Sequence, residues 1–372
     1  MKVKHFYLLL LILCVPISSI AKEIIKKEPK TRKKHPVEFF AYSQSWSNIL
    51  PVKQLLKDEW QQVPNSSASK GFTQNEFGAR IYWKNFSFST SHRYDYFVFS
   101  NSDTAKAFYL ERSDLALDTL DAYNLDLKLL HQRSNGLRLG YKFKLNNFTI
   151  EPRLGYWSSS STRESYLTGT LSSGINGNIS GLVQMREFYS HRNFLRRRNV
   201  NNDWNIGGTG LTFDVHMFWQ PTEDITLLAD LKDIYSDFSL DRSGYSEGKV
   251  DTEGTFINSV GGIAYLPLYR GKEVEEKHQF ELPEQVDIIG FYHSKQLSYL
   301  ARYKRQGEQN FYYLGFEVQH QDSSTRISLD IENIAAEIQY KNNWLSLIFA
   351  IDNTDIEQAL QLNLGLSVNY SF

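Results

Sequence analysis

The feature that most constrains this chain is the strict alternation of apolar and polar residues in its last segment. One side of an extended chain would carry Leu360, Leu362, Leu364, Leu366, Val368, Tyr370 and Phe372. The other side would carry Gln361, Asn363, Gly365, Ser367, Asn369 and Ser371. Because successive side chains of a β-strand point to opposite faces, this period of two predicts a strand with one apolar and one polar face.

The same alternation recurs in pairs of segments that are joined by turn residues. LTFDVHMFW (211–219) and ITLLADLKD (225–233) flank a proline-containing turn at 220–224. LRLGYKF and FTIEPRLGYW meet at Leu145-Asn146-Asn147, and five more alternating segments follow in the C-terminal third. Period-two alternation on both arms of a turn is typical of a β-hairpin. The sequence therefore predicts an all-β chain of successive antiparallel strands.

A soluble sheet would also alternate, with one face buried in a core. Here the second face carries Asp, Lys, Arg and Asn in strand after strand, and the segments have the roughly 9 to 11 residues that cross a bilayer. Tryptophans near segment ends, such as Trp157, Trp219 and Trp344, fit interfacial girdles. The mean hydropathy of -0.43 agrees, since only alternate residues would face lipid. We predict a transmembrane antiparallel up-and-down β-barrel of about 14 to 18 strands.

The N-terminus has the features of an export signal. Lys2 and Lys4 precede an apolar stretch that is too short to span a bilayer, and Ser19-Ile20-Ala21 supplies small residues for cleavage. We predict a signal peptide at 1–21, cleaved near Ala21. A lipoprotein that is lipidated at Cys14 is the alternative. It is disfavoured because Leu13 is bulky at the position before the cysteine, where a small residue is expected. Cys14 is the single cysteine, so the mature chain is predicted to have neither a disulfide nor a thiolate metal site.

Residues 22–71 are predicted to lie outside the barrel wall. Residues 22–36 form a basic arm, and 37–71 are interpreted as a plug or a periplasmic segment with a short helix between 52 and 60. The barrel is predicted at 72–372. If the C-terminus is periplasmic, 352–358 and a long loop at 266–284 would be extracellular, and 341–343 would be periplasmic.

The aromatic C-terminus resembles the closing-strand signal of bacterial outer-membrane barrels. The matching positions are Leu366, Val368, Tyr370 and Phe372. The resemblance implies that barrel-assembly machinery reads this segment, and that the last strand pairs with the first. It also implies a Gram-negative outer membrane as the location, with outer-membrane lipid and lipopolysaccharide as partners.

The polar face of the predicted strands would line the lumen. Candidate pore-lining residues are Asp126, Lys128, Asp214, His216, Asp230 and Lys232. With a formal net charge of -1, the chain has no overall positive charge that would attract nucleic acid. No HExxH or CxxC motif occurs, and Gly207–Gly210 precedes a strand rather than a helix, so no metal or cofactor is predicted. These glycines are interpreted as a flexible lead into the hairpin.

HQRSNG at 131–136 is similar to the HxSNG stretch of outer-membrane phospholipase A. Arg133 is inserted here, so His131 and Ser134 are three residues apart and would point to opposite sides of a strand. A base and a nucleophile so placed cannot share a hydrogen bond. We interpret Ser134–Gly136 as a turn and predict that the chain is not an enzyme, with a barrel-housed lipid hydrolase as an alternative.

Two longer segments resemble the FadL-type hydrophobic-compound channels and related conjugation-linked barrel proteins. The matching positions are Gly208, Gly210, Pro221, Thr222, Thr226, Leu282 and Pro283. The resemblance implies a passive channel or transporter for small, hydrophobic molecules. The lysine-rich N-terminus departs from the small, apolar hatch of those channels, so no ligand residues are carried over. A non-transporting structural barrel, or an accessory to surface assembly or secretion, is the alternative.

Overall fold

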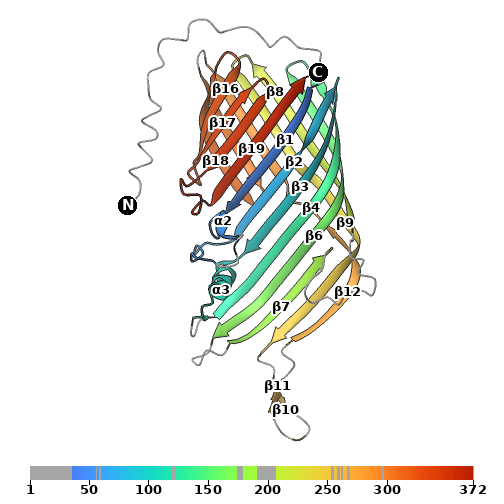
Figure 1. The fold of residues 1–372 in the computed structure, drawn as a ribbon, viewed down its shortest axis with the longest axis vertical. Coiled ribbons are helices and arrows are strands. Elements are labelled where there is room, and N and C mark those ends of the chain that lie inside the picture. Colours follow the sequence, from blue (N-terminus) through green and yellow to red (C-terminus); the bar gives the residue numbers. More distant parts are fainter. Residues whose placement is uncertain are drawn as a thin grey trace, which may run out of the picture.

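A computed structural model describes residues 36–55, 57, 60–118, 122–173, 179–190, 207–252, 255–257, 260, 263–265, 269–294 and 297–371. These residues form a closed antiparallel β-barrel in which neighbours in sequence are neighbours in space (Figure 1). The strands of the barrel are β1 (Pro36–Ser47), β2 (Lys70–Trp83), β3 (Phe86–Ser100), β4 (Ala122–Tyr141), β5 (Phe143–Leu145), β6 (Phe148–Ser173), β7 (Ile179–Tyr189), β8 (Gly208–Thr222), β9 (Ile225–Asp251), β12 (Tyr269–Phe280), β13 (Gln285–His293), β14 (Ser298–Gln306), β15 (Gln309–Gln319), β16 (Ser323–Asp330), β17 (Ala335–Asn342), β18 (Leu345–Ile351) and β19 (Gln361–Ser371).

Three positions around the barrel are occupied by a strand in two pieces. β4 and β5 pair with β6 at successive levels, and β7 and β8 do the same between β6 and β9. β12 and β13 both pair with β9. With each such pair counted once, the described part of the chain forms 14 strands, within the predicted range. A separate pair, β10 (Thr255–Ile257) and β11 (Ile263–Tyr265), lies beyond the end of β9.

The barrel closes between its first and last strands. β1 pairs with β19 from Pro36↔Ser371 to Trp46↔Gln361, and with β2 on its other side. The predicted barrel start at residue 72 is therefore wrong, because 36–47 already form a wall strand. Small or polar residues on the outer side of β1, at Ala41, Ser43 and Ser45, weaken its alternation in sequence.

Two interpretations of local segments are also wrong. The predicted loop at 266–284 contains β12. Most residues of β12 are exposed, and charged side chains occur on both of its faces. The predicted turn at 134–136 lies inside β4, where Gly136 pairs with Ser91.

The outer surface carries a lipid-facing apolar band. Leu364 and Leu366 point outward from β19, as the alternation predicts, and outward-facing apolar residues continue around the barrel. Trp83, Trp219 and Trp344 are exposed at the end of the barrel that also holds both ends of the described chain. Among the described helices, none has the length and apolar character needed to cross a bilayer.

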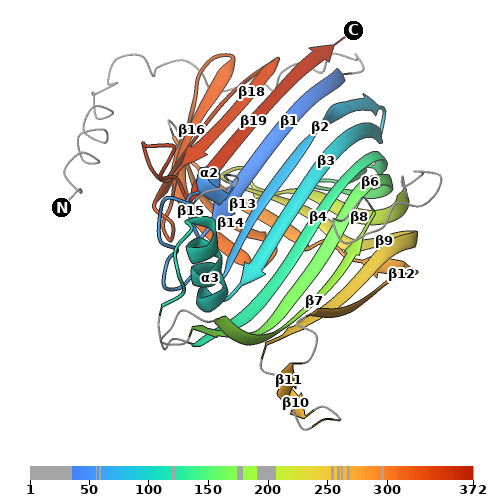
Figure 2. The same ribbon diagram turned by 60° about the horizontal axis from the view of Figure 1, so that its bottom comes forward.

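The barrel wall has two unequal parts, which are visible in Figures 1 and 2. We call β14 to β19 the short wall, and β4, β6, β7, β9 and β12 the extended wall, because these latter strands continue well beyond the others. α3 (Ser102–Arg112) covers the free edge of β4 at this end. Its N-cap residue Asn101 accepts a hydrogen bond from the Thr104 N–H at 2.8 Å and donates one to the Asn124 carbonyl at 2.7 Å.

The β1–β2 connection packs at the same end of the barrel. It contains α2 (Val52–Leu55), so the short helix predicted at 52–60 is confirmed for its first four residues. Ile49, Leu50 and Ala68 bury their side chains together with Ala105 of α3. A hydrogen bond from Lys53 holds the pKa of the Glu357 carboxyl below its usual range and ties this connection to the β18–β19 turn.

Candidate pore and its lining

A layer of inward-facing apolar side chains crosses the lumen at the rim of the short wall. We call this layer the septum. It consists of Trp46, Phe72, Phe97, Leu130, Trp157, Phe238, Leu240, Phe280, Leu282, Phe311 and Tyr313. All of these side chains are at most 6% exposed, and they come from strands on several sides of the barrel. The septum therefore packs across the lumen from β1 and β15 to β9 and β12, and Trp157 belongs to it rather than to the interfacial girdle predicted for it.

Glycines on neighbouring strands make room for the largest septum side chains. A Cβ atom on Gly136 would lie 2.2 Å from Cε3 of Trp157, and one on Gly210 would lie 2.3 Å from the Phe238 ring. Any other residue at these positions would displace the aromatic ring. Gly136, which we predicted in a turn, and Gly210, which we predicted in a flexible lead, are strand residues that leave room for septum rings. Both interpretations are corrected.

Directly beside the septum, Arg93 holds two carboxylates in the lumen. Its guanidinium donates to Asp95 at 2.7 and 3.1 Å and to Asp233 at 3.0 and 2.9 Å. All three side chains are buried. The guanidinium also lies 5.2 Å from the Trp157 ring. This arrangement ties β3 to β9 across the interior and satisfies charges that would be costly to bury alone.

A second arginine repeats the arrangement beside the same indole. The Arg138 guanidinium lies 4.6 Å from the Trp157 ring and 3.1 Å from the Asp214 carboxylate, and it also contacts Glu76. Asp214, a predicted pore-lining residue, is therefore buried in the lumen in an ion pair. Its second oxygen accepts a hydrogen bond from the Asp233 N–H at 2.8 Å.

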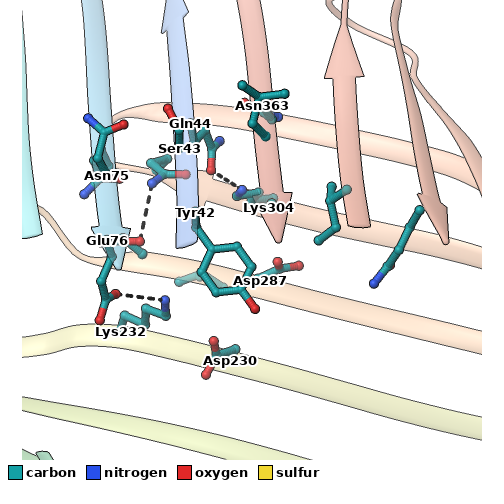
Figure 3. A pocket seen from close by; sticks show the side chains of 18 of the residues that line it. Tyr42, Ser43, Gln44, Asn75, Glu76, Asp230, Lys232, Asp287, Lys304 and Asn363 are labelled. Atoms are coloured by element: carbon teal, nitrogen blue, oxygen red, sulfur yellow. Dashed lines mark hydrogen bonds and ion pairs between the residues drawn. The ribbon is translucent and has the colours of Figure 1, made fainter. Parts of the chain in front are cut away.

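On the far side of the septum from the end of the extended wall, the lumen contains a polar cavity of about 480 Å³ (Figure 3). His216, Asp230 and Lys232 line it, as the sequence predicts for their face of the strand. Lys232 lies 3.7 Å from Glu76, and the His216 Nδ1 atom lies 3.7 Å from Asp230. The cavity is thus bordered by paired charges. A role of these residues in passage of a solute stays a prediction.

Asp126 and Lys128 are placed elsewhere. They occupy the concave, lumen-side face of the extended wall, where Asp126 is in register with Thr168 and Lys128 with Tyr166. The Lys128 ammonium lies 3.4 Å from the Glu164 carboxylate. The six predicted residues all lie on the inner face of the barrel but are divided by the septum. His216, Asp230 and Lys232 line the cavity, Asp214 is buried beside the septum, and Asp126 and Lys128 lie on the extended wall.

Sequence reasoning missed the septum and the arginines beside it. Phe97 and Trp157 interrupt largely polar faces of β3 and β6; Arg93 shares the face of Phe97, and Arg138 lies on the polar face of β4. Large aromatic residues on the polar side of a barrel strand were the feature of the sequence that could have predicted the septum. Their meeting in one layer depends on the relative stagger of strands far apart in sequence, which no local pattern encodes.

The residues of the hydrolase motif lie on opposite faces of β4, as predicted. Ser134 is fully buried in the lumen and accepts a hydrogen bond from Gln132 at 3.1 Å. His131 lies on the other face, where its Nε2 atom accepts a hydrogen bond from Arg133 at 3.3 Å. The barrel wall therefore separates this base from this nucleophile.

The wall between the cavity and the lipid-facing surface is thin at the β1–β19 seam. An apolar groove of about 690 Å³ lies on the outer surface here. Tyr42, Ser43, Leu364 and Gly365 border both the groove and the cavity. A Cβ atom on Gly365 would lie 3.1 Å from Cδ1 of the Tyr42 ring, so glycine leaves room for this ring beside the seam.

The predicted assembly signal lies at this closing seam. Leu366, Val368 and Tyr370 are on the outer side of β19, in register with Ala41, Phe39 and Val37 of β1. Phe372 lies outside the described residues. Recognition of these residues by assembly machinery stays a prediction, as do the signal peptide and basic arm, which also lie outside the described residues.

Comparisons with known proteins give structural likeness only. No protein-family model matches the chain, and no curated protein matches it significantly. Matching solved structures include a mutant of the TodX monoaromatic hydrocarbon channel (9% identity, 92% of this chain and 91% of that chain, TM-score 0.45) and the toluene transporter TodX of P. putida (10%, 92% and 91%, 0.44). A Pseudomonas aeruginosa FadL homologue also matches (12%, 91% and 88%, 0.41). The predicted FadL-type resemblance thus reappears among the matching structures, and at these scores it carries no argument about function.

Proposed function

We propose that this protein is an outer-membrane channel that admits small apolar molecules and excludes ions. The observation that carries the proposal is the septum, an apolar layer placed between two polar compartments of one barrel. A hydrophobic constriction excludes water and therefore opposes the passage of charged solutes, which would lose their hydration. A small apolar molecule loses no such hydration and gains contacts with the septum side chains.

A route for such a molecule follows from the thin wall at the β1–β19 seam. Ion pairs border the cavity beyond the septum, so this compartment offers an apolar solute little stabilisation. The apolar groove on the outer surface is separated from that cavity by the backbone around Ser43 and Gly365. On this proposal, cargo leaves the lumen sideways into the membrane. The proposal includes export by the signal peptide and assembly in the outer membrane beside lipopolysaccharide.

The test compares conductance with uptake in vesicles that contain the assembled protein. We expect no stable ion conductance, together with entry of a small uncharged aromatic solute and exclusion of a charged dye of similar size. Trp157→Ala combined with Phe238→Ala should open the septum and produce measurable conductance. Trp219→Ala, which removes an exposed tryptophan from the lipid-facing side, is the matched control and should leave conductance unchanged.

A non-transporting structural barrel is the second candidate. The near-complete burial of the septum and of the Arg93 ion pairs favours it, because both also rigidify a barrel that carries nothing. It predicts that neither solute enters vesicles, whether or not the septum variant conducts ions. Entry of the uncharged solute through the unmodified protein is therefore the deciding observation.

A further inference from the structure

The concave face of the extended wall gathers cations from three neighbouring strands. These cations border a pocket of about 520 Å³ on the opposite side of the septum from the polar cavity. They are Arg186 of β7, Lys249 of β9, and Arg270 and Lys272 of β12. We call this pocket the cationic pocket. It is independent of the route through the barrel that we propose above.

Strand register arranges these side chains in two rows on one face of the sheet. In the first row, Arg186 is directly opposite Glu247, which is opposite Lys272. In the second row, Gln184 is opposite Lys249, which is opposite Arg270. Adjacent strands are about 4.8 Å apart and the rows are two residues apart, about 7 Å. Four cationic side chains from three adjacent strands therefore border one pocket on one face of the sheet.

The charges of this pocket are only partly balanced within the protein. Lys249 lies 3.3 Å from the Asp251 carboxylate, and Lys272 lies 3.3 Å from the Glu247 carboxylate. Within the described residues, no carboxylate forms an ion pair with Arg186 or Arg270. Lys249 and Arg270 are also like charges placed directly opposite each other, which destabilises a strand pair. An anion bound between them would relieve this repulsion.

Neighbouring side chains fix the position of the Arg186 guanidinium. Its guanidinium lies 4.6 Å from the centre of the Tyr166 ring. The Tyr166 hydroxyl donates to Glu164 at 2.6 Å, and Glu164 in turn lies 2.8 Å from the Nε2 atom of His278. A guanidinium that rests on an aromatic face keeps its N–H edges available for the two oxygens of a carboxylate or phosphate.

We infer that the cationic pocket binds a soluble anion that carries a phosphate or carboxylate group. A membrane lipid could present the same phosphate, but the pocket lies on the lumen side of the extended wall. The outer side of the same strands carries different side chains, including Tyr269 and the Arg242–Glu275 pair. A ligand in solution at the mouth of the barrel reaches the pocket without crossing the wall.

The test is calorimetric titration of the full, detergent-solubilised protein with pyrophosphate and with citrate at low ionic strength. We expect saturable binding that Arg186→Ser combined with Arg270→Ser weakens by roughly a hundredfold, about tenfold for each charged hydrogen-bonding group removed. Arg242→Ser, on the outer side of the same wall, is the matched control and should bind like the unmodified protein. A heat-dependent shift in gel mobility verifies that each variant is assembled.

Three results would overturn the inference. The first is the absence of saturable binding of either anion. The second is an equal loss in the Arg242→Ser control, which would indicate a general effect of charge. The third is binding only of lipopolysaccharide micelles, which would assign the pocket to a lipid phosphate. If the double variant does not assemble, Lys272→Gln tests the same pocket with a smaller expected loss. Conductance and uptake do not enter any of these results.

Discussion

The short wall ends at the septum, whereas the extended wall continues beyond it and loses the alternation there. In the short wall, outward residues such as Leu314 and Leu364 are apolar and most inward residues are polar; Phe311 and Tyr313 of the septum are exceptions. In the extended wall, β12 carries charges on both faces, and α3 covers the edge of β4 with backbone and side-chain hydrogen bonds. Lipid on one side imposes the alternation, whereas water on both sides removes it. Beyond the lipid, the wall depends on ion pairs and edge protection instead.

The largest effect is expected at the septum, the level beyond which only the extended wall continues. Gly136→Val should force the Trp157 ring out of the layer and destabilise the barrel by at least about 4 kcal/mol, enough to prevent assembly. Heat-dependent gel mobility would report the loss. Gly207→Val is the control, because the nearest atom to a Cβ there is 3.7 Å away. Normal assembly of Gly136→Val would contradict the tight fit we describe.

The next effect compares a buried ion pair with an exposed one. Arg93→Met leaves Asp95 and Asp233 buried without their partner and should cost about 3 to 5 kcal/mol in free energy of unfolding. Arg242→Met on the extended wall removes an exposed pair with Glu275 and should cost about 0 to 1 kcal/mol. Denaturant titration in lipid vesicles measures both. Similar costs would mean that the lumen is as well hydrated as the outer surface.

The third effect tests the lipid boundary itself. Leu364→Arg places a charge in the lipid-facing band of the short wall and should cost about 2 to 4 kcal/mol. Ile179→Arg introduces the same side chain at the tip of the extended wall, where the residue is exposed, and should change stability by about 0.5 kcal/mol or less. The same unfolding measurement serves for both variants. A large cost at Ile179 would place that tip in the membrane.

The smallest effect concerns the protected edge of β4. Asn101→Ala removes the N-cap of α3 and the bond to the Asn124 carbonyl, so we expect a local loss of about 1 kcal/mol. Hydrogen exchange should increase in α3 and in the first residues of β4, while the short wall stays protected. Asn342→Ala, at a turn of the short wall, controls for general effects. Uniform exchange throughout the barrel would show that the two walls do not open separately.

The same comparison explains what the sequence could predict. The last five strands, the outward positions of Leu364 and Leu366, and the opposed faces of His131 and Ser134 follow from local alternation. β1 and β12 do not, because β1 has small or polar residues toward lipid and β12 has no lipid to face. Asp230 and Lys232 could be assigned to the lumen, but not to one side of a septum. The position of the septum depends on which residues of distant strands lie at the same level along the barrel axis.

The septum draws on the chain from Trp46 in the first strand to Tyr313 in the β15 strand. Its members come together only when the two ends of the sheet join at the β1–β19 seam. Closure of the sheet and completion of the septum are thus one structural event. On the function proposed above, no closed barrel would exist with an open septum.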